Sequence, residues 1–191
     1  MPRKINLNQP EIAQKAMTIF WKNGFKGVDY DTLANELGVS TSTIYNKLGK
    51  EELFVEGLRM YVRTFSDPAL SEIRDSEKGI EVLRGTLFKL IDALLDGTFS
   101  RSCFVVNAIM EVRNEIDEVN VVYDEWLSLA RGSYKAALHR AFALGEIKDE
   151  SKIPDYIEFL MSTVFALSIL YKVKSRKELR AFIDGQLTLI V

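Results

Sequence analysis

The stretch DTLANELGVSTSTIYNKLGK, residues 31–50, decides how the N-terminal part of this chain folds. It is typical of two short helices joined by a tight turn. Leu33 and Leu37 give the first helix an apolar stripe, and Gly38 is expected to end it because glycine readily adopts the left-handed conformation. Ser40 is a good N-cap for the second helix. This is the pattern of a helix-turn-helix, although an ordinary surface hairpin of two helices has a similar turn.

The second helix of this motif has only a narrow apolar side, formed by Ile44 and Leu48. Its other side chains are small and hydroxylated, or polar and basic. A helix with such a face can enter the major groove closely and bond to phosphates and base edges. We expect Thr41 and Ser42 to approach base edges and most of the others to hold phosphates. The predicted DNA contacts are Ser40, Thr41, Ser42, Thr43, Tyr45, Asn46, Lys47 and Lys50.

Residues within and around this motif follow a recognisable order along the chain. They are Ile12, Ala16, Phe20, Gly24, Phe25, Leu33-Ala34, Gly38-Val39-Ser40, Thr43-Ile44-Tyr45 and Lys50-Glu51-Glu52-Leu53. As a set they resemble the TetR/AcrR family of bacterial transcriptional regulators, over about the first third of the chain. The resemblance implies an all-α fold with an N-terminal three-helix DNA-binding head and a helical-bundle body. We therefore expect a DNA-binding domain at residues 1–50 and an effector-binding and dimerisation domain at residues 51–191.

The motif departs from the family's pattern in two places. The family usually has Phe three residues after the tyrosine, and two further residues before the lysine. Here Leu48 replaces Phe and only Gly49 separates it from Lys50, so the linker is one residue short. The family also tends to have Thr where Asp29 stands; Asp29 is still a good cap, but its charge would repel a phosphate. Both departures concern the docking geometry rather than the class of protein.

The distribution of charge is more informative than its total. The chain has 191 residues, of which 47% are apolar and 27% charged, so it is globular, and its net charge is −2. Residues 1–50 nevertheless carry seven Lys and Arg against four Asp and Glu, whereas the remainder is net acidic. A basic head on an acidic body suits a protein that contacts phosphates at one end only.

The chain lacks signs of export or membrane insertion. A single cysteine excludes an internal disulfide framework and fits a reducing compartment, and the first nine residues lack the apolar core of a signal peptide. The most apolar run, residues 156–171, is interrupted by Glu158 and three hydroxylated residues, short of the roughly 18 apolar residues expected of a membrane span. We expect a cytoplasmic protein with no membrane partner.

Hydrophobic periodicity predicts helices almost throughout the chain. A capping pair, Asn8 and Glu11, is expected to start the first helix, and Gly24 to end it. A fourth helix is expected from Lys50 to about Phe65, broken by Asp67-Pro68, with a polar stretch at residues 71–79 separating head from body. Further helices are expected at residues 80–95, 103–112 and 118–144, then from Pro154, and finally after a Ser175–Glu178 capping box.

The helix that begins near Pro154 is apolar on nearly every side between Ile157 and Leu170. A helix buried all round needs two partners, and we expect one of them to be a second subunit. The resemblance supports a homodimer through the last two helices, with Leu167 and Leu170 as outward positions.

Cys103 allows two interpretations. It is either a packed free cysteine that acts as a small hydrophobe, or a sensor of oxidants or electrophiles. The segment around it resembles one found in a subgroup of the family, some of whose members sense reactive species. Packing is favoured, because the chain has no second cysteine to resolve an oxidised thiol.

The body is expected to hold a small-molecule effector, because the family keeps a cavity between its central helices. Most candidate lining residues are aromatic and are first of all core residues. Asn107 is polar among apolar neighbours and could orient a ligand. The candidate pocket residues are Phe88, Cys103, Phe104, Asn107, Tyr123, Trp126 and Phe165.

We expect no enzyme, no cofactor and no metal site. The only histidine, His139, has no cysteine or carboxylate at metal-ligand spacing and is expected on the surface. Glu111, Glu115 and Glu118 recur at helical spacing, which is more typical of a solvated face than of acid–base catalysis. The sequence has no nucleophile elbow and no phosphate-binding glycine loop.

These observations predict a homodimeric transcriptional regulator, which we expect to be a repressor. A small-molecule effector would release it from a double-stranded DNA operator. The effector would shift the helix that starts at Lys50 and so change the spacing of the two heads. The alternatives are a helical protein-interaction module that has lost operator binding, and a redox- or electrophile-sensing regulator based on Cys103.

Overall fold

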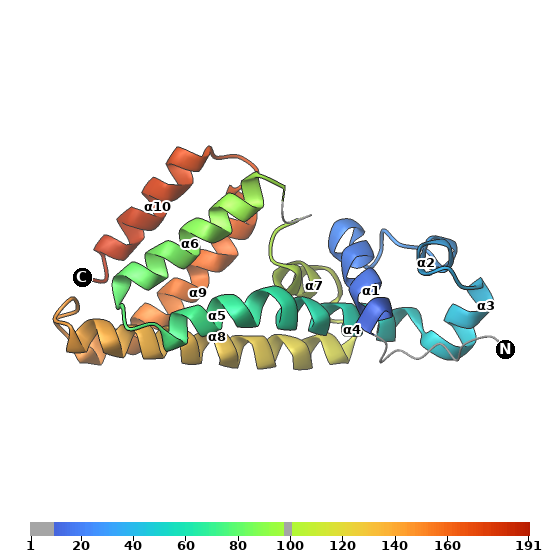
Figure 1. Cartoon of the computed structure of the whole chain (residues 1–191), viewed down its shortest axis with the longest axis horizontal. Helices are drawn as coiled ribbons and strands as arrows, with labels where there is room; N and C mark the ends of the chain where they lie inside the picture. Colours follow the sequence, from blue (N-terminus) through green and yellow to red (C-terminus); the bar gives the residue numbers. More distant parts are fainter. Residues whose placement is uncertain (1–9, 98–100) are drawn as a thin grey trace. The chain divides into compact units, whose positions relative to one another are not determined.

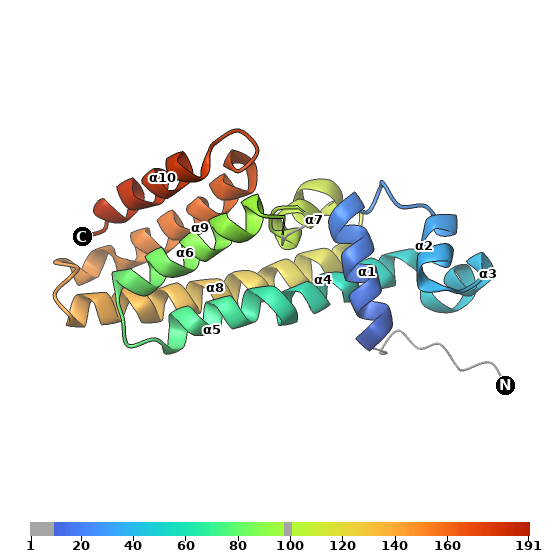
Figure 2. The same ribbon diagram turned by 45° about the horizontal axis from the view of Figure 1, so that its top comes forward.

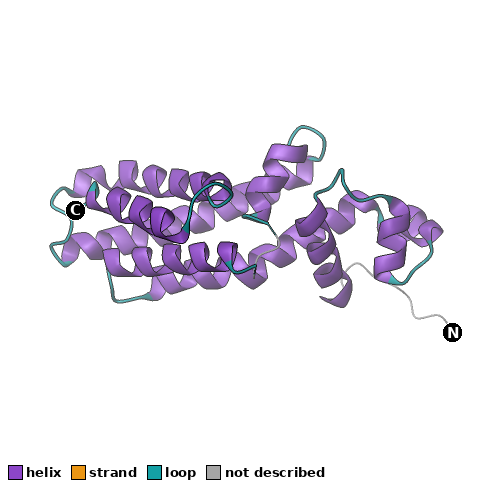
Figure 3. Cartoon of the chain, turned by 90° about the horizontal axis from the view of Figure 1, so that it is seen from above, coloured by secondary structure: helices purple, strands orange, loops and turns teal. Residues whose placement is uncertain are grey.

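The computed structural model describes residues 10–97 and 101–191. Within these ranges every regular element is a helix (Figures 1 and 3). The expected all-α fold is therefore confirmed. Asn8, which was expected to cap the first helix, lies outside the described residues.

The chain divides into two compact units, each of which takes two segments. One unit is Met1–Thr64 with Cys103–Glu125, and the other is Phe65–Ser102 with Trp126–Val191. The domain boundary expected after residue 50 separates a DNA-binding part from an effector-binding part, and it stays a prediction. The units are described separately below.

The first unit contains the helix-turn-helix and the helices that pack on it. Its elements are α1 (Pro10–Asn23), α2 (Tyr30–Leu37), α3 (Thr41–Thr43), the π-helical turn η1 (Ile44–Leu48), α4 (Lys50–Tyr61), α7 (Phe104–Val112) and the first part of α8 (Asp117–Ala143). As expected, α1 stops before Gly24 and α2 stops at Gly38.

The core of this unit forms where α1 crosses α4. Phe20, Leu53 and Phe54 are fully buried, and the rings of Phe20 and Phe54 meet edge to face at 5.1 Å. Gly57 permits the close approach of the two helices, since a Cβ at this position would lie 2.8 Å from the backbone nitrogen of Met17. The apolar stripes of both helices are thus used against each other.

The expected break after Phe65 is wrong. The helix α4 continues through a π-helical turn, η2 (Val62–Ser66), directly into α5 (Asp67–Asp75). Pro68 occupies the first turn of α5, a position that proline tolerates well. The expected polar separator at residues 71–79 is also wrong in its first half, because Leu70 and Ile73 are buried and hold α5 in place. The helix ends instead at Asp75, with Ser76 as its C-cap.

The second unit contains α5, α6 (Ile80–Leu95), the rest of α8, α9 (Ile153–Leu170) and α10 (Arg176–Thr188). Figures 1 and 2 show α10 beside both α6 and α9, which agrees with their packing contacts. The Ser175–Glu178 capping box that starts α10 is confirmed.

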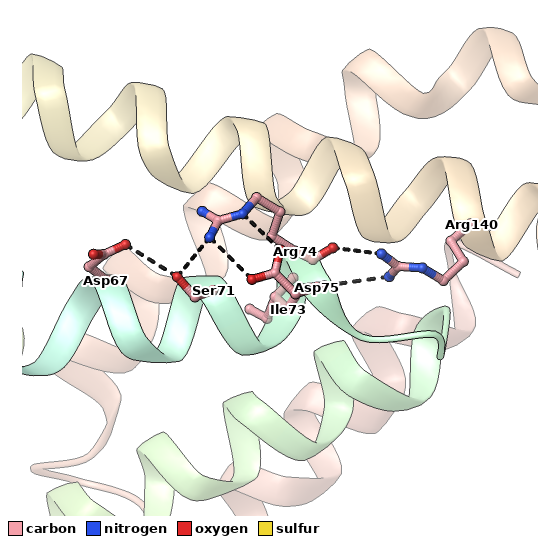
Figure 4. Close-up of polar contacts among 6 residues, drawn as sticks. All are labelled: Asp67, Ser71, Ile73, Arg74, Asp75 and Arg140. Atoms are coloured by element: carbon pink, nitrogen blue, oxygen red, sulfur yellow. Dashed lines mark hydrogen bonds and ion pairs between the residues drawn. The ribbon is translucent and has the colours of Figure 1, made fainter.

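The corner between α5 and α6 is held by residues from the end of α8. Figure 4 shows the guanidinium of Arg140 donating to the carbonyl groups of Ile73 and Arg74, at 3.4 and 2.7 Å. Close by, the Glu146 carboxylate accepts a 2.8 Å hydrogen bond from the backbone N–H of Ile80, at the start of α6. A cation therefore caps a helix C-terminus and an anion a helix N-terminus, as the helix dipoles favour.

The helix α9 is apolar but not buried on every side. Together with the 3-10 turn η3 (Glu150–Lys152) it is long and apolar enough to cross a membrane by length and composition alone, a test that core helices also pass. Leu167, expected to point outward, is fully buried, whereas Ile169 is 60% exposed. The periodicity of the sequence predicted that α9 is apolar on most sides, but not which of its apolar residues are exposed.

Candidate nucleic-acid interface

The second helix of the helix-turn-helix is anchored underneath and polar above. Ile44 and Leu48 are buried, at 0% and 2% exposure, as expected. Ser40 caps the helix by accepting from the backbone N–H of Thr43. Its hydroxyl also lies 2.8 Å from those of Ser42 and Thr43, so three hydroxyl groups form one cluster. Ser42, Asn46 and Lys47 are exposed on this face.

Two aspartates at the start of α2 shape the same face. Asp29 caps α2 through a 2.7 Å hydrogen bond from the backbone N–H of Thr32. Hydrogen bonds from the side chain of Thr32 and from its backbone hold the pKa of the Asp29 carboxyl below its usual value. The expectation that Asp29 still caps is confirmed. Asp31 accepts a 2.9 Å hydrogen bond from the hydroxyl of Thr41. Thr41, predicted to approach base edges, therefore has its hydroxyl engaged by a neighbouring helix.

The shortened linker before α4 is accommodated by an unusual turn. The residues Ile44–Leu48 form a π-helical turn, which Gly49 closes by donating from its N–H to the carbonyl of Ile44 at 2.7 Å. Gly49 has φ 71° and ψ 137°, a conformation essentially restricted to glycine. The wider turn and this glycine let the chain enter α4 with one residue fewer, while Leu48 stays in the core.

Tyr45, a predicted phosphate contact, lies flat against Tyr30. Their ring centroids are 3.9 Å apart and their planes differ by 4°. Tyr45 is 63% exposed and Tyr30 is half-buried. Tyr30 was not among the predicted site residues, and no sequence signal marks it, since only the fold brings the start of α2 beside η1.

Lys50, the last predicted DNA contact, has turned towards the protein. Its ammonium lies 4.2 Å from the centre of the Phe25 ring, in a cation–π contact. Burial lowers the pKa of Lys50, while the nearby charges of Asp29 and Glu111 oppose that shift. Asp29 and Lys50 thus partly neutralise each other beside the motif.

Of the three carboxylates expected on a solvated face, Glu115 and Glu118 are exposed as expected, but the expectation is wrong for Glu111, which is half-buried. The carboxylate of this α7 residue accepts hydrogen bonds from the backbone N–H groups of Phe25 and Lys26, at 3.0 and 2.8 Å. Glu115 binds the side chain of Lys26 at 2.5 Å, in an exposed ion pair. Periodicity put the carboxylates on one face, but could not show that the loop after α1 covers part of it.

The seven predicted pocket residues are divided between the two units. Cys103 and Phe104 pack in the first unit, where the Phe104 ring contacts Phe54 and Tyr61. Asn107 and Tyr123 belong to the same unit, and both have interaction partners.

In the second unit the rings of Trp126 and Phe165 lie 6.3 Å apart. The guanidinium groups of Arg84 and Arg180 each lie 4.9 Å from the centre of the Phe88 ring. The pocket assignment stays a prediction. Two shallow surface hollows, of about 560 and 250 Å³, are lined by none of the seven residues.

Cys103 is buried, at 7% exposure, at the start of α7. Burial raises the pKa of its thiol, although hydrogen bonds with the Val106 backbone and the Tyr61 side chain oppose the shift. A buried thiol with a raised pKa is poorly reactive, which favours the packed interpretation. His139 is exposed and pairs with Glu150 at 3.2 Å, and no group of potential metal ligands occurs among the described residues.

Sequence comparisons point to regulators of the helix-turn-helix class. No protein-family model matches the chain. It is 20% identical, over the full length of both chains, to the uncharacterized HTH-type transcriptional regulator YezE of Bacillus subtilis. It is 22% identical to the HTH-type transcriptional repressor ComR of Escherichia coli, over 81% of this chain and 75% of that one.

A solved structure confirms the fold. The cysteine mutant of the TetR family transcriptional regulator CifR, complexed with a 26 bp double-strand operator DNA, superposes with a TM-score of 0.84 at 20% identity and covers both chains completely. The resemblance seen in the sequence is therefore confirmed as a likeness in fold over the whole chain. At this level of identity the match shows the fold and leaves the function to be argued from the site.

Proposed function

We propose that this protein, which has the fold of the TetR family regulators, is a DNA-binding transcriptional regulator that acts as a repressor. The observation that carries the proposal is the exposed polar face of residues 40–47, fixed above a buried apolar side. A hydroxyl cluster, a stacked tyrosine and an exposed lysine suit contact with phosphates and base edges. The solved relative bound to operator DNA and the relative named a repressor support this assignment.

The protein is proposed to act as a cytoplasmic homodimer. Paired heads would read two half-sites about one helical turn apart, as dimeric helix-turn-helix proteins do. Exposed apolar side chains on and after the last two helices, among them Ile169 and Leu189, support an interface there. At 60% and 71% exposure they would be covered only in an assembly.

We also propose that a small-molecule effector releases the protein from DNA. The family resemblance supports it, and so do two hydroxyl oxygens in the second unit, those of Thr86 and Ser133, which are buried and make no hydrogen bond. Buried polar atoms are nearly always paired, so such atoms suit a polar group brought by a ligand. No observation favours the interaction-module alternative, and the burial of Cys103 argues against a thiol sensor.

The test is a titration of the wild type with a duplex of its own upstream DNA at several salt concentrations. A DNA-binding regulator should bind with an affinity that falls steeply as salt rises, because phosphate contacts release counterions. Lys47→Ala should weaken binding and reduce the salt slope by about one. Lys148→Ala, an exposed change after the end of α8 and away from α9 and α10, is the matched control and should bind as the wild type does. Absence of salt-sensitive binding, also to duplexes selected from a random pool, would leave the interaction module as the better interpretation.

A further inference from the structure

The loop that joins α1 to α2 holds a carboxylate from a distant part of the chain. Gly24 has φ 76°, and the next two backbone N–H groups, of Phe25 and Lys26, point to the same side. Consecutive N–H groups after a left-handed residue form a concavity that binds anions. Here each oxygen of the Glu111 carboxylate accepts one of these N–H groups, at 3.0 and 2.8 Å.

Glycine is required at position 24 for two reasons. Its positive φ is unfavourable for other residues, and a Cβ there would lie 2.7 Å from a carboxylate oxygen of Glu111. The loop and the carboxylate are therefore fitted to each other. Glu111 is only half-exposed, so its charged hydrogen bonds are partly shielded from water.

The Glu111 carboxylate and the two N–H groups that it binds form a clamp. Contacts lead from this clamp to both ends of the helix-turn-helix. Phe25, whose N–H is bound, packs edge to face on Phe54 at 5.2 Å and lies under the ammonium of Lys50. Lys50 starts α4 directly after the turn that ends the second helix. At the other end, Asp29, the N-cap of α2, follows Phe25 by four residues. A loop held in this way therefore also holds the start of α2 and the residues that follow η1 in place.

We propose that Glu111 is a positioning residue for operator binding: its carboxylate holds the loop after α1, and through it the helix-turn-helix, in the geometry that docks on DNA. The residue lies on α7, outside the segment that would touch DNA. The role rests on the proposed function, and it predicts that α7 controls operator affinity without contacting the operator. Any event that withdraws this carboxylate would loosen the head.

The test compares Glu111→Gln with Glu115→Gln. Glutamine keeps the shape of Glu111 but presents an NH₂ group to one of the two N–H donors, whereas Glu115 makes only an exposed side-chain ion pair with the same loop. At a temperature where circular dichroism shows all variants folded, Glu111→Gln should bind the operator duplex about tenfold more weakly. Glu115→Gln should stay within about twofold of the wild type.

Hydrogen exchange provides a readout that separates positioning from general stabilisation. In Glu111→Gln the amides of Phe25 and Lys26 should exchange faster, while those of α10 stay protected as in the wild type. A general loss of stability would instead accelerate exchange in both places. If Glu111→Gln does not fold, Glu111→Asp replaces it, since the shorter side chain keeps the charge but cannot reach both donors, and intermediate affinity is expected.

A folded Glu111→Gln or Glu111→Asp that binds DNA as the wild type does overturns the positioning role and leaves the proposed function intact. Loss of affinity with unchanged exchange at Phe25 and Lys26 also overturns it, because the clamp would not be the cause. A wild type that binds no DNA removes the proposed function, and this inference with it.

Discussion

The rings of Tyr30 and Tyr45 stack face to face, 3.9 Å apart and within 4° of parallel, and so join the first turn of α2 to η1. One face of Tyr45 is covered by Tyr30, yet the residue remains 63% exposed. An exposed tyrosine loses rotamer freedom when it binds a phosphate, and a ring already held by a neighbour has less to lose. If Tyr45 contacts a phosphate as proposed, the stack with Tyr30 would lower the entropic cost of that contact.

This relationship predicts a graded effect on DNA affinity. Tyr45→Ala should weaken binding to all sequences, because it removes a phosphate contact, whereas Tyr30→Ala should weaken it by roughly two- to tenfold through lost preorganisation. Tyr30→Phe keeps the stack and should bind nearly as the wild type does. Fluorescence anisotropy with one duplex at moderate salt is the measurement. An unchanged affinity for Tyr45→Ala would refute this docking face.

Gly49→Ala should damage the motif. The residue has φ 71° and ψ 137°, where a side chain costs about 1–3 kcal/mol, and the new Cβ would also meet the carboxylate of Glu52. We expect a lower free energy of unfolding and weaker DNA binding, measured by denaturant titration and anisotropy. The control is Gly132→Ala on α8, where a Cβ meets no atom within 4 Å; it should stabilise the protein by up to about 1 kcal/mol. A harmless Gly49→Ala would show that the turn has other solutions.

Cys103 should be unreactive in the native protein. Alkylation at pH 7 should be slow until the chain is unfolded, because burial keeps the thiol protonated and inaccessible. Fast native labelling would revive the sensor interpretation.

The same burial predicts a pH dependence of stability. The native pKa of Cys103 lies above its unfolded value of about 9.0, so the native state retains the thiol proton longer. The stabilisation is complete below that pH and is lost as pH rises through the native pKa. The free energy of unfolding should therefore fall more steeply above pH 9 for the wild type than for Cys103→Ala. Parallel curves for the two proteins would contradict this assignment.

Ile169, which is exposed, is the position of α9 that tests the predicted homodimer, because Leu167 is buried within the subunit. Ile169→Glu places a charge on the exposed apolar side of α9 and should yield folded monomers with weakened operator binding, whereas Leu167→Glu should unfold the body because the residue is fully buried. Met110→Glu, at an exposed apolar position of α7, should remain dimeric. Sedimentation combined with circular dichroism distinguishes these results. A wild-type monomer at micromolar concentration would contradict the dimer and the mechanism of paired heads.

The sequence by itself determined most of the local structure. The ends of α1 and α2, the capping of α2 by Asp29, the capping box of α10 and the burial of Ile44 and Leu48 all followed from patterns within a few residues. Caps and helical periodicity depend on neighbours along the chain, so they can be read without a fold. The polar face of the second helix was predicted for the same reason.

Only the tertiary structure decided which distant residues meet. The contact of Glu111 with the loop after α1 spans more than 80 residues, and the stack of Tyr30 on Tyr45 joins two separate helices. Pro68 does not end the helical run, because it lies in the first turn of α5, whose Leu70 and Ile73 are buried. Leu167 lies inward because packing between helices, rather than periodicity, decides which side of α9 is buried. These features depend on close packing between elements, which a one-dimensional pattern does not contain.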